Sequence, residues 1–158
     1  MPKQGPIIII EDDQDDILTL KEAMADAEVW NPLMIFTNAP DAYDYLKSTE
    51  DQPFLILCDV NLPRQNGIEF KHQLDNDPEM RARSIPFIFY TTYVTQYAIN
   101  EAYRNLTVQG FFQKNNTYQE LKDVIRIIID YWRICKQPVF PLNGTNAIPA
   151  LEKHKTGK

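Results

Sequence analysis

Short apolar runs divide this chain, and each of them ends in a polar residue. Four such runs cover Ile7–Ile10, 53–58, 87–90 and Gly110–Gln113. Runs of this length that are rich in Ile, Leu and Phe are typical of parallel strands buried on both faces. We therefore predict strands at these four places, the second over 54–59, and a further strand at 33–37.

Helical periodicity separates the predicted strands. Between residues 15 and 28 apolar residues recur at helical spacing, and Asp13, Asp15 and Asp16 give this helix the acidic start that a helix dipole favours. Further helices are predicted at 40–47, 67–74, 95–104 and 117–136. The polar segment 76–84 is predicted to be a loop.

Cap residues mark the starts of the last two predicted helices. Thr95 can cap the helix that follows it, and Thr117-Tyr-Gln-Glu120 has the spacing of a capping box. Strands alternating with helices, joined by short right-handed connections, predict a doubly wound α/β fold with a five-stranded parallel sheet. We expect the flavodoxin-like strand order 2-1-3-4-5.

Length and composition indicate one domain. The chain has 158 residues, of which 44% are hydrophobic, and we expect the domain to cover 1–137. Residues 138–158 are rich in Pro, Asn, Thr and Lys and are predicted to be a tail without a fold of its own.

Charge and targeting signals point away from nucleic acid and membranes. The net charge is −6, which does not indicate a nucleic-acid surface. Cys58 and Cys135 match neither a metal knuckle nor a redox pair. No signal peptide is evident, and the apolar runs are too short to span a bilayer. We expect a cytoplasmic protein with reduced thiols.

The polar ends of the predicted strands carry the candidate chemistry. In an open parallel sheet all of these ends lie along one edge, where sites form. Crowded carboxylates there would favour a hard divalent cation such as Mg²⁺. A carboxylate can also accept a phosphoryl group, with a lysine and a hydroxyl to neutralise charge. The residues that meet at this edge are Glu11, Asp12, Asp59, Thr91 and Lys114.

Several motifs together resemble one protein family. They are the stretch from Ile7 to Asp13, Leu57 to Pro63 with Asn66-Gly67, Phe89 to Thr92, and Gly110 to Lys114. In this order, each at a strand end, they resemble the receiver domain of bacterial two-component response regulators over roughly residues 5–136.

The resemblance implies a role for each site residue. Asp59 would be the phosphoacceptor and Mg²⁺ the cofactor. The remaining roles would be metal binding by Glu11, Asp12, Asp59 and the backbone carbonyl of Asn61, phosphoryl contact by Lys114, and switching by Thr91 and Phe111. One departure is Asn115, where the family usually has proline. Another is Thr92, which would crowd the phosphoryl pocket slightly.

The resemblance also implies a function. We expect a single-domain response regulator that takes its phosphoryl group from a histidine kinase and is no enzyme beyond autodephosphorylation. Phosphorylation would change the surface of the helix at 95–104, the strand at 110–113 and the last helix, which then binds a downstream protein. The Glu-Asp-Asp start and the extended C-terminus look similar to the small regulators of phytochrome-type kinases.

Three alternatives remain open on the residues alone. A haloacid-dehalogenase-type phosphatase would place Asp-x-Asp on its first strand, whereas the acids here are adjacent. A flavodoxin-like FMN electron carrier would place a Ser/Thr/Gly-rich loop there, and this acidic loop repels phosphate. A degenerate receiver would act only as an interaction module, but all five site residues are retained.

The last predicted helix has an unusually wide apolar arc. One stripe contains Leu121, Val124, Ile125, Ile128, Trp132 and Cys135. A second stripe beside it contains Ile127, Tyr131 and Ile134. A helix with one face on the sheet and the other in water needs only the first. We therefore expect a homodimer through the last helix, coverage by residues 139–142, or both.

Overall fold

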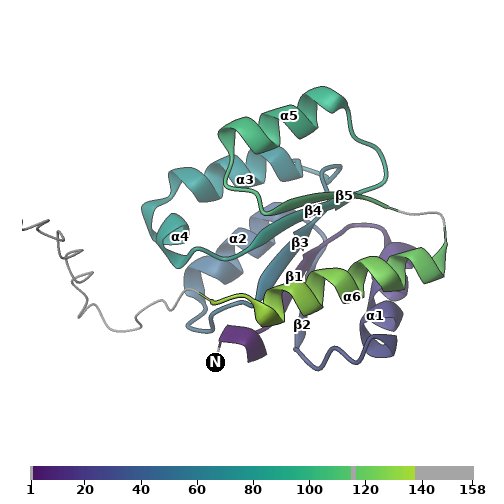
Figure 1. Cartoon of the computed structure of the whole chain (residues 1–158). Helices are drawn as coiled ribbons and strands as arrows, with labels where there is room; N and C mark the ends of the chain where they lie inside the picture. Colours follow the sequence, from purple (N-terminus) through teal and green to yellow (C-terminus); the bar gives the residue numbers. More distant parts are fainter. Residues whose placement is uncertain (1, 115–116, 138–158) are drawn as a thin grey trace, which may run out of the picture.

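The computed structural model describes residues 2–114 and 117–137 (Figure 1). The predicted tail at 138–158 and the departure at Asn115 lie outside these residues. Five parallel strands form one sheet in the order β2-β1-β3-β4-β5, which confirms the predicted fold. The strands are β1 Ile7–Ile10, β2 Leu33–Phe36, β3 Leu55–Cys58, β4 Phe87–Thr91 and β5 Gly110–Gln113.

Strand register brings the polar strand ends together. Ile10 is paired with Cys58, so that Glu11 and Asp59 leave the sheet side by side. The Asp59 amide continues the ladder by donating to the Ile10 carbonyl at 3.0 Å. Between β4 and β5, the Lys114 amide donates to the Thr91 carbonyl at 2.7 Å. The backbone ladder thus places all these residues at one edge.

Helices cover both faces of the sheet, as Figure 1 shows. One face is covered by α1 and α6, and the other by α2, α3 and α5. The helices are α1 Gln14–Asp26, α2 Ala39–Ser48, α3 Gly67–Asn76, α4 Pro78–Arg83, α5 Gln96–Asn105 and α6 Tyr118–Ile134, after a 3₁₀ turn at Pro2–Gln4. No helix in the described part of the chain is long and apolar enough to cross a membrane.

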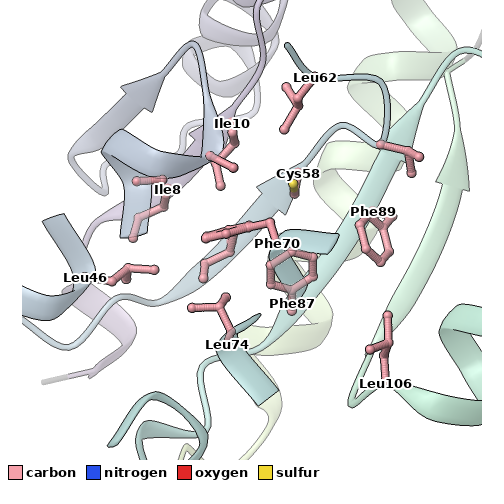
Figure 2. Packing of buried hydrophobic residues seen from close by; sticks show 14 of the residues in the cluster. Ile8, Ile10, Leu46, Cys58, Leu62, Phe70, Leu74, Phe87, Phe89 and Leu106 are labelled. Carbon is pink, nitrogen blue, oxygen red and sulfur yellow. The ribbon is translucent and has the colours of Figure 1, made fainter. Parts of the chain in front are cut away.

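Alternation along the central strands explains why they are apolar throughout. Ile8 and Ile10 pack under α2 and α3, whereas Ile7 and Ile9 pack under α1 and α6. Side chains of successive residues point to opposite faces of a sheet, so a strand covered on both sides needs apolar residues at every position. Figure 2 shows the first of these two cores, with Phe70 lying against the sheet.

The prediction of a loop at 76–84 was wrong, because α4 lies there. Asp77 caps this helix by accepting hydrogen bonds from the amides of Glu79 and Met80. Pro78 occupies its first position, where no amide donor is needed. Met80 is buried in the core, and Ser84 ends the helix with a left-handed φ of 53°. Met80 and Ala82 are the apolar residues of this six-residue helix, and their spacing of two leaves no helical periodicity to detect.

The predicted caps of the last two helices are confirmed. Thr95 accepts from the Ala98 amide, and Thr117 accepts from the Glu120 amide. In α6 the first apolar stripe faces the sheet, joined by Ile129, which is 1% exposed and belongs to neither predicted stripe. The second stripe is open: Ile127, Tyr131 and Ile134 are 63%, 60% and 83% exposed. Coverage by residues 139–142 lies outside the described residues.

Candidate functional site

The five residues predicted to meet at the sheet edge do meet there. Glu11 follows β1, Asp59 follows β3, Thr91 ends β4 and Lys114 follows β5. Glu11, Asp59 and Thr91 are buried. Asp12 is exposed beside them. The site is therefore a cluster of polar side chains held at the ends of four strands.

Asp59 is held by three donors. One carboxylate oxygen, Oδ1, accepts from the Thr91 hydroxyl at 2.7 Å and from the Asn61 amide at 3.0 Å. The other, Oδ2, accepts from the Lys114 ammonium at 3.1 Å. Burial raises the pKa of Asp59, but these hydrogen bonds and the charge of Lys114 outweigh it and hold the pKa below its usual value. Asp59 is thus ionised, as a nucleophile must be.

Lys114 joins three carboxylates. Its ammonium contacts Asp16 at 2.8 Å and Asp59 at 3.1 Å, and it also pairs with Glu11. Burial lowers the pKa of Lys114, but the contacts with Asp16 and Glu11 outweigh it and raise the pKa above its usual value. For Glu11 the effect of burial is the larger one: it raises the pKa to about 7, although the hydrogen bond and the charge of Lys114 lower it.

Asp16 is the member of this cluster that sequence reasoning missed. We had assigned it to the acidic start of α1 with Asp13 and Asp15. Asp13 does cap the helix, accepting from the Asp16 amide at 3.0 Å. The side chain of Asp16, however, turns to Lys114. Asp12 lies before the helix, which begins at Gln14 after the cap Asp13, so helical periodicity did not set Asp16 apart from its acidic neighbours.

Three carboxylates at the edge can hold a cation. Glu11, Asp12 and Asp59 each offer an oxygen, and these oxygens lie within 4.8 Å of one another. Counted as ionised, the four acids Glu11, Asp12, Asp16 and Asp59 carry four negative charges against the one positive charge of Lys114, a net −3. A divalent cation with oxygen ligands fits this set, because it relieves the repulsion that remains.

Asn61 contributes more than the backbone carbonyl assigned to it. Its side-chain amide donates to the Tyr93 carbonyl at 3.0 Å and to the Thr91 hydroxyl at 3.3 Å. The loop after β3 is thereby joined to the loop after β4. A change at Asp59 can reach the start of α5 through these bonds.

Phe111, for which a switch role is predicted, lies on β5 next to β4. It is half-buried on β5, and its ring centroid is 5.1 Å from that of Phe89 on the neighbouring strand.

On the other side of the site, Gly67 begins α3 against the Asp59 backbone. A Cβ at this position would lie 2.2 Å from the Asp59 carbonyl oxygen, so only glycine permits this approach.

Comparisons with known proteins agree with one another. The sequence profile of the response regulator receiver domain matches residues 7–126. Response regulator Rcp1 of Synechocystis sp. is 24% identical over 131 residues, which are 80% of this chain and 87% of that protein.

Solved structures show the same fold. The phosphorylated cyanobacterial phytochrome response regulator RcpA is 26% identical with a TM-score of 0.75, over 85% of this chain and 98% of that one. The Mn²⁺-bound form of Rcp1 is 23% identical with a TM-score of 0.74, over 85% of this chain and 99% of that one.

Proposed function

This chain belongs to the response regulator receiver domain family and is a response regulator of two-component signalling, and we propose that Asp59 is its phosphoacceptor. The observation that carries this proposal is the triple contact of the Asp59 carboxylate with Thr91, Asn61 and Lys114. The family matched over residues 7–126 is the receiver domain, which favours this reading over the phosphatase and flavodoxin alternatives.

The phosphoryl donor would be a histidine kinase. A carboxylate oxygen of Asp59 forms the new P–O bond while the P–N bond to the kinase histidine breaks. The bonding electrons return to the imidazole nitrogen, which then takes up a proton. Lys114 and the Thr91 hydroxyl are placed to stabilise the charge that gathers on the phosphoryl oxygens. This step needs positioning and charge neutralisation, and the site supplies both.

We propose Mg²⁺ as the cofactor, held by Glu11, Asp12, Asp59 and the backbone carbonyl of Asn61. When bound, it would neutralise phosphoryl oxygens during transfer. The carboxylate oxygens gathered within 4.8 Å support the site. Rcp1 was solved in a Mn²⁺-bound form, which supports the binding of a divalent cation by this chain.

Phosphorylation would be read through Thr91 and Phe111. The Thr91 hydroxyl now donates to the Asp59 carboxylate, and a phosphoryl group there would offer it new acceptors. Thr91 leads into the loop before α5, and Phe111 packs on the strand next to it. A shift of this pair would alter the surface of α5, β5 and α6, where we place the downstream protein.

The partners of the chain are proposed from chemistry and from its relatives. RcpA is named a phytochrome response regulator, which supports a phytochrome-type kinase as the donor here. We place the transfer in the cytoplasm. We also propose a homodimer through α6, because its second apolar stripe is open.

A phosphodonor experiment tests the proposal. After incubation with acetyl phosphate and Mg²⁺, the intact mass should rise by one phosphoryl group, and a chelator should prevent this. The adduct should be absent in Asp59→Asn and present in Asp41→Asn, which removes an exposed carboxylate from α2. An adduct that persists in Asp59→Asn would overturn the assignment.

A further inference from the structure

A second pocket lies at the opposite edge of the sheet from Asp59. It has a volume of about 230 Å³ and opens between α3, α4 and the segment before β5. Leu46, Leu74, Met80 and Phe87 form apolar walls, and Figure 2 shows three of these side chains around the amino ends of β3 and β4. Its lining is that of a small-molecule site, but its volume is below the usual range of about 300–1,000 Å³, so only a small ligand would fit.

A buried ammonium group faces this pocket. Lys71 is 5% exposed. In the described part of the chain its one carboxylate partner is Asp75, at 2.9 Å, and its ammonium also lies 4.9 Å from the centre of the Phe87 ring. An ammonium has three N–H donors, so this ion pair leaves donors that a ligand can use. Burial lowers the pKa of Lys71 despite Asp75.

The partner of Lys71 is shared. Asp75 also accepts from the Thr107 amide at 2.8 Å and from the Thr107 hydroxyl at 2.6 Å. These bonds hold Asp75 in place against the segment before β5. Its charge is therefore spread over three donors, and Lys71 receives only part of it.

A second cation stands at the rim. Arg81 lines the same pocket from the last turn of α4 and is exposed. No carboxylate lies within ion-pair distance of Arg81 among the residues that the structure describes. Lys71 and Arg81 against Asp75 leave one net positive charge. A buried ion pair does little for stability by itself, which makes a binding role the better account of a lysine at this place.

We propose that this pocket binds a small monocarboxylate with an apolar body. The carboxylate would lie between Lys71 and Arg81, where charge-assisted hydrogen bonds are strongest. The apolar body would lie against Leu74 and Phe87. One net positive charge selects a monoanion, and the limited volume selects a short chain or a single ring. This inference is independent of the function of Asp59.

Benzoate is a suitable probe, with benzamide as its neutral counterpart. Titration of the full chain, followed by amide NMR signals, should show saturable shifts at Thr107 and Gln109, which line the pocket. Benzamide should bind at least about tenfold more weakly, since it lacks the charge. Asp59→Asn should bind benzoate as the wild type does. Loss of binding in that variant would place the anion at the phosphoacceptor and overturn the proposal.

Two variants locate the carboxylate. Lys71→Met keeps the bulk of the side chain, and Arg81→Gln changes an exposed residue that folding tolerates. Each variant should lower the affinity for benzoate by about tenfold, which is the loss expected when a hydrogen bond to a charged group is removed. The matched control is Arg104→Gln, which changes an exposed arginine in the last turn of α5 outside the pocket. Equal affinity for benzamide, unchanged binding in folded Arg81→Gln, or no saturable binding would each overturn the proposal.

Discussion

Lys114 is the residue at which the charges of the proposed phosphoacceptor site converge. Its ammonium contacts Glu11, Asp16 and Asp59. Asp16 differs from the other two, because 43% of its side chain is exposed and it takes no part in the acidic cation cluster. In the proposed transfer, an incoming phosphoryl group would bring more negative charge and would contact Lys114. Asp16 would then compete with the phosphoryl group for this lysine.

Asp16→Asn should speed phosphorylation by acetyl phosphate. Removing one negative charge reduces repulsion of the donor and frees Lys114, so we expect the initial rate to rise by about two- to tenfold at low salt. The rate of adduct formation by intact mass measures this. Asp15→Asn makes the same charge change on the same turn without a contact to Lys114. A slower Asp16→Asn would show that Asp16 instead positions the lysine for transfer.

The site could be predicted from sequence to the extent that it follows from strand ends. Asp59, Thr91 and Lys114 each adjoin the end of an apolar run, so the parallel sheet alone brings them together. Asp16 lies inside a helix, and its side chain could as well have pointed to solvent. The role of the Asn61 side chain depends on the course of two loops. Neither leaves a periodic signal in the sequence.

Among the elements, α4 shows how a helix can form without a periodic sequence. Its start depends on Asp77, which caps it and also accepts from the Tyr43 hydroxyl at 2.6 Å and from Lys47 at 3.1 Å. One carboxylate thus joins α2, α3 and α4. The strands and the longer helices were predicted within one or two residues, because continuous apolar runs and caps fix them. The signal for α4 was limited to Asp77-Pro78.

Asp77→Asn should lower the melting temperature near neutral pH, and the loss should vanish in acid. The hydrogen bond from Tyr43, followed by that from Lys47, lowers the pKa of Asp77 to about 2. A depressed pKa stabilises the fold above the unfolded value near 4 and loses this effect as pH falls through about 2. Asparagine can still cap the helix, so the change isolates the charge.

Melting curves of the two proteins across this pH range measure the effect of Asp77. Wild type should melt higher at neutral pH, and the curves should converge as the pH falls from about 4 to about 2. Asp51→Asn, at an exposed residue, should melt close to the wild type throughout. A difference of the same size at both ends of the range would mean that the charge of Asp77 contributes nothing.

At the scale of the whole molecule, the open side of α6 is the feature that a monomer leaves unexplained. Ile127, Tyr131 and Ile134 lie mostly in solvent although the helix already packs its other face on the sheet. A two-fold dimer would place this stripe against its own copy. Burying three such side chains contributes about 1.5–3 kcal/mol each, against the cost of association. A dimer in the micromolar range would result.

Ile127→Glu combined with Ile134→Glu should give a folded monomer. Sedimentation of the wild type, with and without beryllofluoride and Mg²⁺, should show a dimer at high concentration that the double variant cannot form. Leu18→Glu is the matched control, since Leu18 is an apolar residue of α1 with 59% exposure, and it should leave the dimer intact. A wild type that sediments as a monomer under both conditions would contradict the dimer.

Gly67 has a consequence for the tolerance of this chain to mutation. In a random library screened only for folded protein, position 67 should be depleted of every other residue, because any Cβ would collide with the Asp59 carbonyl. Asp59 itself, the proposed phosphoacceptor, should accept replacement in the same screen. Two touching residues would therefore be revealed by different selections, one by folding and the other by signalling.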